Sequence, residues 1–444
     1  MRVIIIGGVA AGMSAAAKFR RLDKDATIQV YEKSPIVSFG ACGLPYFVGG
    51  FFDNENQMIA RTPEKFKEAG IDIKTKHQVL NIDFDNKTLD VKDLETGNVF
   101  TDTYDKLMIS TGADAIIPPI KNINLKNVHT LKSMEDGKIL KEKMKDKNIK
   151  KVAIIGAGFI GLEVVEAAFE HKKEISVFQL DDTILKNIFD KEITDLLEKE
   201  LTDKGVKLFL NTKVTELKGT DKVEKIITET EGIDADLVVL ATGVKPNTQF
   251  LQDTNLKMAK NGAIIVDNQG KTSIKDVYSA GDCATVSHLL KQEPSYIPLA
   301  TVANKFGRIV GENLADSGSV YEGSLGSACI KVLHMEAGRT GLSESEAKDL
   351  NLDYATVFIT DKNQTDYYPG QQPIHIKLIY DKNTKVILGG QVAGKKDAVQ
   401  RVNALAVCIY AKLTTKQLGM MDFCYSPPFA RTWEALNVAG NVAK

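Results

Sequence analysis

Two glycine-rich turns, about 150 residues apart, constrain the fold of this chain more than any other feature. The first is RVIIIGGVAAG, which begins at residue 2, and the second is KVAIIGAGFIG, which begins at residue 151. In each, a short run of β-branched residues leads into glycines and then into a helical pattern. A strand, a tight glycine turn and a helix open a nucleotide-binding βαβ unit. The chain is therefore predicted to contain two such units.

The second turn is the more complete one. Gly156, Gly158 and Gly161 form the pattern GxGxxG. The first glycine permits the tight turn, the second lets the backbone approach a pyrophosphate, and the third lets helix and strand pack closely. The N-terminus of the following helix offers N–H groups to the phosphates. We predict that this turn binds a dinucleotide.

The first turn keeps Gly7 and Gly12 but has Val9 at the position of the middle glycine. Taken in isolation, it could be a packing turn and nothing more. Glu32 favours a nucleotide site, because it ends the next predicted strand 20 residues after Gly12. A carboxylate at that place accepts hydrogen bonds from ribose hydroxyls. Two nucleotide sites in one chain indicate two redox cofactors.

The corresponding strand of the second unit ends in Gln179. Neither a ribose-binding carboxylate nor an arginine for a 2′-phosphate stands there. Asp181 and Asp182 follow closely and would repel a phosphate. We predict that this unit prefers NADH, with NADPH as the alternative.

Short strand patterns alternate with helical patterns over the first two thirds of the chain, which predicts parallel sheets in an α/β architecture. These strands are predicted at 3–6, 27–31, 152–155, 175–178 and 237–240. After about residue 323 the pattern changes to longer strands at 354–360, 374–380 and 386–390, with one helix near 398–412. This change predicts a separate α+β domain at the C-terminus.

The composition excludes several classes of protein. The 57 Lys and Arg residues against 58 Asp and Glu leave a net charge of -1, which argues against a nucleic-acid or membrane-surface partner. The five cysteines lie at 42, 283, 329, 408 and 424, too scattered for a disulfide scaffold, a paired zinc site or a redox CxxC motif. We expect a protein of a reducing compartment, the cytoplasm.

The N-terminal apolar run superficially imitates a signal peptide, but glycines interrupt it and Arg20 and Arg21 stand where a cleavage site would be expected. We interpret it as mature structure. No apolar run reaches the length of a transmembrane helix, so no membrane span is expected. The lysine-rich stretch 141–151 is predicted to be the solvated end of a helix.

Cys42 lies between glycines in the segment SFGACGLPY, soon after Glu32. A loop at the carboxyl end of a parallel strand places it near the ligand crevice of the first unit. No resolving cysteine follows, since Phe47 stands five residues on, so Cys42 cannot form the short internal disulfide of a dithiol reductase. Cys42 could instead hold a mixed disulfide with a small thiol, or a sulfenic acid after meeting a peroxide. The other four cysteines are interpreted as core or helix residues.

Three further strand ends carry glycines. Gly281 and Asp282 end a predicted strand within 274–284, where a carboxylate could bind the polyol chain of a cofactor. Thr111 and Gly112 end a similar strand in the first unit, and Gly243 ends one in the second. We add these residues to the predicted cofactor sites.

With these motifs the whole chain resembles the flavin disulfide reductase superfamily. Within it, the chain is similar to the single-cysteine branch of coenzyme A disulfide reductases, NADH oxidases and NADH peroxidases. The segments SFGACGLPY, DYYPG at 366–370 and CYSPPF at 424–429 look most like the coenzyme A disulfide reductases. Oxidase and peroxidase members place a histidine two residues before the last glycine of the first turn, where this chain has Ala10.

The resemblance implies a glutathione-reductase-like fold with two Rossmann-like domains and a C-terminal α+β dimerisation domain. An FAD-binding domain would comprise residues 1–117 and 245–322, an NAD(P)H-binding domain 118–244 and a dimerisation domain 323–444. FAD would contact Gly7, Gly12, Glu32, Thr111, Gly112, Gly281 and Asp282. NAD(P)H would lie at Gly156, Gly158, Gly161, Gln179 and Gly243.

Members of the family are homodimers in which one subunit completes the active site of the other. Tyr367 and Tyr425 would then reach Cys42 across the interface, as proton donors or stabilisers of a departing thiolate, with Tyr368 as the alternative to Tyr367. Ser14, Lys18 and Arg21 share one face of the first helix and suit the phosphates of coenzyme A. Ser38 and Arg61 are further candidates for substrate binding.

The leading hypothesis is the reduction of coenzyme A disulfide, or of coenzyme A persulfides and mixed disulfides, by NAD(P)H through Cys42. An NADH oxidase that reduces oxygen to water or peroxide at the flavin is the alternative in the same fold. A flavin-binding redox sensor without fast turnover is the alternative of another class.

Overall fold

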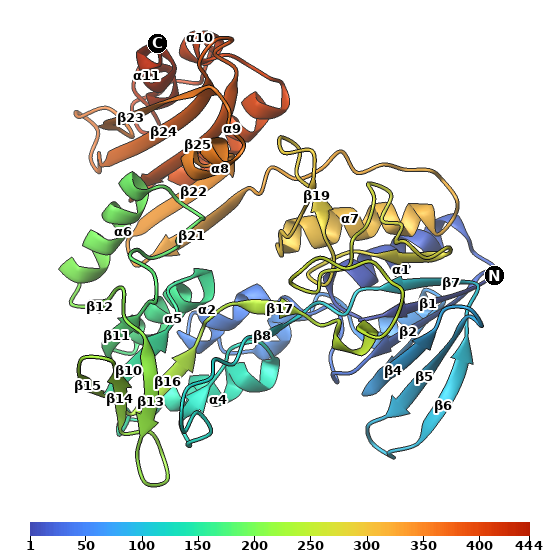
Figure 1. The fold of residues 1–444 in the computed structure, drawn as a ribbon. Helices are drawn as coiled ribbons and strands as arrows, with labels where there is room; N and C mark the ends of the chain where they lie inside the picture. The colour runs from blue at the N-terminus through green and yellow to red at the C-terminus, as the bar shows by residue number, and fades with distance from the viewer. The chain divides into compact units, whose positions relative to one another are not determined.

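The computed structural model describes residues 1–444, which form two compact units. The first unit comprises Met1–Leu44, Phe52–Ile116 and Val244–Ser324, and the second comprises Pro45–Phe51, Ile117–Gly243 and Leu325–Lys444. The predicted mixed α/β architecture, with two Rossmann-like sheets and a C-terminal α+β part, is confirmed (Figure 1). The division into three functional domains stays a prediction.

The first unit is built on a parallel sheet with the strand order β18-β7-β1-β2-β3. Its strands are β1 (Arg2–Ile6), β2 (Thr27–Glu32), β3 (Ile71–Thr75), β7 (Lys106–Ile109) and β18 (Val277–Ser279). The run Val3–Ile5 is fully buried, as a strand covered on both faces requires. The remaining strands of this unit are β4 (His77–Asp83), β5 (Thr88–Asp93), β6 (Val99–Thr103), β8 (Ala113–Ala115), β17 (Val244–Pro246), β19 (Val286–Ser287) and β20 (Pro294–Ser295).

Two helices of the first unit, α1 (Ala10–Leu22) and α7 (Ala300–Asn313), lie side by side over this sheet (Figure 1). Gly307 and Gly311 of α7 face α1 so closely that a Cβ on either would lie 2.4 or 2.5 Å from a carbonyl oxygen of α1. The short helices are α2 (Leu44–Val48), which runs into the second unit, and α3 (Pro63–Glu68). The close α1–α7 seam fixes which side chains of the two helices share a face.

The second unit contains a parallel sheet of its own, with the order β12-β11-β10-β16-β9. Its strands are β9 (Val128–His129), β10 (Lys151–Ile155), β11 (Glu174–Phe178), β12 (Lys207–Phe209) and β16 (Leu237–Leu240). Helices α4 (Met134–Lys145), α5 (Phe159–Glu170) and α6 (Lys191–Asp203) connect these strands. A small antiparallel sheet consists of β13 (Val214–Lys218), β14 (Lys225–Thr228) and β15 (Gly232–Asp234).

The C-terminal part of the second unit is an antiparallel sheet with the order β21-β22-β25-β24-β23 (Figure 1). Its strands are β21 (Ala328–Val332), β22 (Met335–Gly341), β23 (Tyr354–Lys362), β24 (Pro373–Asp381) and β25 (Ile387–Gly394). The helices here are α8 (Glu344–Asp349), α9 (Ala398–Tyr410), α10 (Thr415–Gly419) and α11 (Ala435–Val442). The strands and the helix predicted after residue 354 are thus confirmed, with ends shifted by a few residues.

The prediction of a solvated lysine face at 141–151 is wrong for Lys141. Its side chain is only 4% exposed, and its ammonium lies 3.9 Å from the centre of the Phe47 ring. A cation over an aromatic face keeps its charge stabilised away from water, and the long lysine stem packs as an apolar chain.

None of the helices combines the length and the apolar character that a membrane span requires.

Candidate active site

The first glycine turn has no room for larger residues. Gly7 has a φ of 103°, and a Cβ there would lie 2.1 Å from the Ser110 carbonyl oxygen. A Cβ on Gly12 would lie 2.0 Å from the Gly7 carbonyl oxygen. No side chain caps the N-terminus of α1, and its first turn has no acidic residue. The turn therefore presents backbone amides and a positive helix end to an anionic ligand such as a pyrophosphate.

Glu32 is the last residue of β2 and is only 6% exposed. Its carboxylate accepts the Gly8 N–H at 2.7 Å on one oxygen and the Ser34 N–H at 2.8 Å on the other. Two backbone donors thus orient the carboxylate beside the turn. Each oxygen keeps a second lone pair, so the group can still accept from ribose hydroxyls.

The other predicted FAD residues lie at the carboxyl ends of strands in the same sheet. Gly281 follows β18, and a Cβ there would lie 3.0 Å from the Ala11 side chain in the first turn of α1. Asp282 comes next, and its carbonyl oxygen accepts the Tyr296 hydroxyl at 3.0 Å. Thr111 follows β7 and donates its hydroxyl to the Asn247 carbonyl oxygen at 2.7 Å. The glycine turn, the oriented carboxylate and the open helix end fit a dinucleotide such as FAD.

The second glycine turn repeats this geometry. Gly156 has a φ of 105°, and a Cβ on Gly161 would lie 2.0 Å from the Gly156 carbonyl oxygen. A Cβ on Gly158 would meet nothing within 4 Å, so this glycine faces open space, as one that admits a pyrophosphate should. Gly243 follows β16 with a φ of 107°. Gln179 accepts the Ala157 N–H at 2.8 Å, in the place that Glu32 has in the first unit.

Cys42 lies in the short 3₁₀ turn Ala41–Gly43, and its side chain is exposed. The Gly40 N–H donates to the Met58 carbonyl oxygen at 2.8 Å, and Phe39 forms an antiparallel bridge with Ile59. A Cβ on Gly43 would lie 2.9 Å from the Met58 sulfur. The Cys42 loop is therefore held against the 58–59 segment, which approaches most closely at Gly43, whereas a Cβ on Gly40 would lie at an ordinary 3.5 Å from the Met58 carbonyl oxygen.

The other cysteines divide into two pairs. Cys283 and Cys408 are buried, as predicted, and burial raises the pKa of the Cys283 thiol. Cys329 and Cys424 are exposed, which corrects their interpretation as core or helix residues. Cys329 lies on β21, an outer strand of its sheet, where alternate side chains face away from the core.

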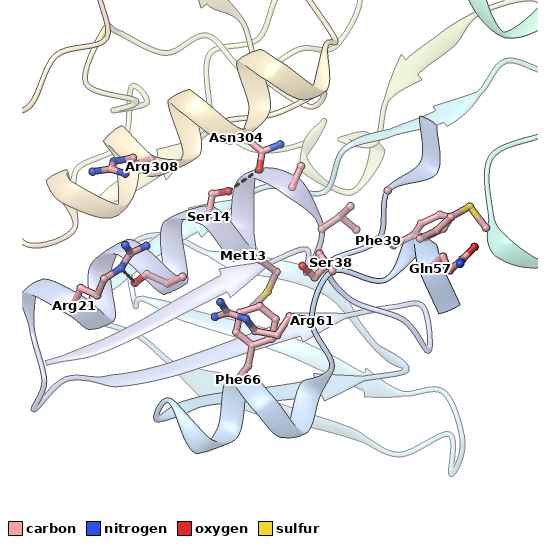
Figure 2. A pocket seen from close by; sticks show the side chains of 16 residues that line it. Met13, Ser14, Arg21, Ser38, Phe39, Gln57, Arg61, Phe66, Asn304 and Arg308 are labelled. Carbon is pink, nitrogen blue, oxygen red and sulfur yellow. Dashed lines mark hydrogen bonds between the residues drawn. The ribbon is translucent and has the colours of Figure 1, made fainter. Parts of the chain in front are cut away.

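A cavity of about 500 Å³ lies beside the Cys42 loop in the first unit (Figure 2). Ser38, Phe39 and Gly40 line it together with the first turn of α1. Its polar lining comes from Ser14, Arg21, Ser38, Gln57, Arg61, Asn304 and Arg308. The Ser14 hydroxyl donates to the Asn304 side chain at 2.8 Å, and the Arg61 guanidinium lies 4.9 Å from the centre of the Phe66 ring. Four of the five predicted substrate residues thus meet at one cavity.

Lys18 is the exception and corrects the predicted substrate face. Its ammonium lies 3.0 Å from the Glu312 carboxylate on α7, and it does not line the cavity. The reason is the α1–α7 seam, since α7 covers the side of α1 that carries Lys18. Arg308, one turn after Asn304 on the same helix, supplies a cation in its place. Sequence reasoning missed Arg308, because no local pattern shows that α7 packs on α1.

The two predicted tyrosines lie together in the second unit. The Tyr367 and Tyr425 hydroxyls are 2.9 Å apart, and this hydrogen bond raises the pKa of Tyr425. Tyr367 lies between β23 and β24, and Tyr425 lies between α10 and α11. The Thr365 hydroxyl donates to the Pro427 carbonyl oxygen at 3.1 Å and ties the two loops. Tyr367 is 71% exposed, so the tyrosine pair lies at a surface of this unit.

A half-buried acidic group in α5, Glu163, was not predicted. Burial and the nearby charge of Glu166 raise the pKa of Glu163 to about 7. The Tyr46 hydroxyl lies 3.5 Å from the Glu163 carboxylate, and Glu166 pairs with Lys331 at 2.5 Å. Glu163 stands two residues after Gly161, so it belongs to the first turns of α5, the helix that follows the second glycine turn.

The sequence profile of the family described as pyridine nucleotide-disulphide oxidoreductase matches residues 1–307. The chain belongs to this family. The profile of the family's dimerisation domain matches residues 327–436. An NADH oxidase of Enterococcus faecalis is 36% identical over 100% of this chain and 99% of its own length. An NAD(P)H coenzyme A polysulfide/persulfide reductase of Pyrococcus horikoshii is 36% identical over 100% of this chain and 98% of its own.

The fold of this chain also matches the fold of solved structures. Reduced CoADR-RHD of Bacillus anthracis superposes with a TM-score of 0.96 at 30% identity, covering 100% of this chain and 80% of that one. As a pyridine nucleotide-disulphide oxidoreductase, the chain is an FAD-dependent NAD(P)H oxidoreductase, which goes against a redox sensor without turnover. The dimerisation domain supports a homodimer.

Proposed function

We propose that this oxidoreductase reduces coenzyme A disulfide, or coenzyme A persulfides and mixed disulfides, with NAD(P)H through Cys42. The observation that carries the proposal is the arginine-lined cavity that adjoins the Cys42 loop. Arg21, Arg61 and Arg308 concentrate positive charge on a chain whose net charge is -1. Such a local charge suits a substrate rich in phosphate.

The position of the cavity also fits a long thiol substrate. Ser38–Gly40 line its wall and lead directly to Cys42. A coenzyme A bound by its phosphates at the arginines could extend its thiol arm along this wall towards the exposed Cys42 side chain. The name of the Pyrococcus horikoshii relative, which acts on coenzyme A polysulfide or persulfide, supports the same substrate class.

The chemistry needs one thiolate and a source of two electrons. The Cys42 thiolate attacks one sulfur of coenzyme A disulfide, forms a mixed disulfide and releases one coenzyme A thiolate. FAD, when bound, relays two electrons from NAD(P)H to this site. Supplied with two electrons in this way, the S–S bond of the mixed disulfide would break, which would restore the Cys42 thiolate and release the second coenzyme A thiolate. Tyr367 and Tyr425 would donate protons to the leaving thiolate, reaching Cys42 from the other subunit of a homodimer.

The glycine turns define the proposed cofactor sites. FAD would be held in the first unit by Gly7, Gly12, Glu32, Thr111, Gly112, Gly281 and Asp282, and NAD(P)H in the second by Gly156, Gly158, Gly161, Gln179 and Gly243. A cytoplasmic location remains a prediction.

An NADH oxidase activity is the second candidate. The Enterococcus faecalis relative with that name supports it. Ala10 counts against a cysteine-sulfenate route, because a methyl group cannot act as an acid or base over Cys42. Oxygen reduction would then take place at the flavin alone.

The two candidates differ in what they need besides NADH. Oxidation of NADH and of NADPH is measured under two conditions. The first is anaerobic and contains coenzyme A disulfide or polysulfide, and the second contains oxygen and no sulfur substrate. We expect rapid anaerobic turnover with a coenzyme A substrate. Substantial turnover only under oxygen would overturn the proposal in favour of the oxidase.

A further inference from the structure

Gln179 ends β11, where a dinucleotide fold usually has a carboxylate for the adenosine ribose. Both polar atoms of its side chain are already used. Its oxygen accepts the Ala157 N–H of the glycine turn at 2.8 Å, and its nitrogen donates to Asp181 Oδ2 at 2.7 Å. Gln179 therefore links the glycine turn to Asp181. Its neutral amide brings no negative charge to a ribose.

Backbone hydrogen bonds also hold the loop that carries Asp181. The Thr212 N–H donates to the Gln179 carbonyl oxygen and the Asn211 N–H to the Asp181 carbonyl oxygen, both at 2.9 Å. The Leu185 N–H donates to the Ala157 carbonyl oxygen at 2.9 Å and ties the following loop to the same turn. The Asp181 carboxylate is thus oriented before any ligand arrives, while part of its surface stays open to solvent.

We infer that Asp181, oriented by Gln179, is the residue that accepts hydrogen bonds from the adenosine ribose and selects NADH over NADPH. This inference rests on the proposed binding of a nicotinamide dinucleotide at the second glycine turn. A carboxylate accepts from the two ribose hydroxyls of NADH, whereas the same carboxylate repels the 2′-phosphate of NADPH. Asp181 is the specificity residue, and Gln179 is the positioning residue behind it.

The neighbouring charges agree with this assignment. Lys186 is the cation that could attract a 2′-phosphate, but its ammonium lies 3.0 Å from Asp182 and 3.5 Å from Asp181. The hydrogen bond to Lys186 lowers the pKa of Asp182, so this carboxylate stays ionised and keeps Lys186 engaged. Asp182 makes no hydrogen bond to Gln179, which makes it a matched control of equal charge one residue away.

The test uses the full-length flavin-loaded protein and two unreactive probes, ADP-ribose and its 2′-phosphate. Isothermal titration gives the Kd of each probe for the wild type and for Asp181→Asn, Asp182→Asn and Gln179→Ala. We expect the wild type to bind ADP-ribose at least about tenfold more tightly than the 2′-phosphate. Asp181→Asn should weaken ADP-ribose binding by about tenfold and remove most of the discrimination.

Gln179→Ala should shift discrimination in the same direction as Asp181→Asn, whereas Asp182→Asn should change the Kd of ADP-ribose within about threefold. An equal loss of ADP-ribose affinity in Asp181→Asn and Asp182→Asn, or unchanged discrimination in Asp181→Asn, would overturn the inference and leave the proposed function intact. If the wild type binds neither probe, the nucleotide site itself is wrong, and the inference is overturned with it.

Discussion

At the scale of single residues, the three arginines of the cavity carry the case for a phosphate-rich substrate. Arg308→Ala removes an exposed cation from the wall of the cavity, together with its 3.6 Å ion pair to Glu312, and leaves the shorter Lys18–Glu312 pair between α1 and α7 in place. A charge-assisted hydrogen bond to phosphate contributes roughly 1.5–3 kcal/mol. We expect KM for coenzyme A disulfide to rise by about tenfold, with kcat nearly unchanged.

Lys305→Ala is the matched control for Arg308→Ala. Lys305 is an exposed cation on the same helix that does not line the cavity. Steady-state kinetics of the two variants at constant ionic strength separate a local contact from a general charge effect. Equal changes in KM for both would show that the cavity does not hold the phosphates.

Glu163 makes the stability of the protein depend on pH. Its carboxyl titrates at about 7 in the folded chain and at the ordinary 4.5 when exposed. The folded state therefore binds more protons between these values, and the free energy of unfolding falls as pH rises through this window. Glu163→Gln cannot ionise. Its gain over the wild type should be small at pH 5 and on the order of 2 kcal/mol at pH 8, after allowance for partial exposure.

Thermal unfolding of the wild type and Glu163→Gln at the two pH values measures this difference as a shift in Tm. The shift should be clearly larger at pH 8 than at pH 5. A Tm difference that does not change with pH would show that the pKa of Glu163 is not raised in the folded protein.

At the scale of elements, local patterns were sufficient to predict both glycine turns and the strands that lead into them. The runs ending at Ile6 and Ile155 are β-branched and lead into glycine, so the strand and the turn are encoded within about ten residues. The partners of α1 were not predictable in this way. Lys18 meets Glu312, and Ser14 meets Asn304, 290 residues along the chain. Such contacts depend on tertiary packing, which no local period reveals.

The glycine turns allow a paired test of the two nucleotide sites. A Cβ on Gly12 or on Gly161 would lie 2.0 Å from a carbonyl oxygen of its own turn, so either turn must open to accept alanine. We expect Gly12→Ala to lose most of its flavin on purification. Gly161→Ala should keep its flavin and bind ADP-ribose weakly.

The flavin-to-protein ratio reports on the site at the first glycine turn, and titration with ADP-ribose reports on the site at the second. Each variant thus serves as the control for the other. Full flavin content in Gly12→Ala, or loss of flavin in Gly161→Ala alone, would contradict the assignment of FAD to the first unit and NAD(P)H to the second.

At the scale of the whole molecule, the proposed active site takes Cys42 from one subunit and the tyrosine pair from the other. A heterodimer of a Cys42→Ser subunit and a Tyr367→Phe/Tyr425→Phe subunit tests this arrangement. One of its two sites would combine the intact cysteine with intact tyrosines, so about half of the wild-type rate should return. If both groups acted within one subunit, the heterodimer would be as inactive as its parents.

The most direct measurement of the central claim is the anaerobic rate of coenzyme A disulfide reduction by Cys42→Ser, with its flavin content checked against the wild type. A hydroxyl cannot replace the thiolate that forms the mixed disulfide. The account predicts a fall on the order of a thousandfold or more in kcat while flavin remains bound. Turnover of coenzyme A disulfide by Cys42→Ser at the wild-type rate would contradict it.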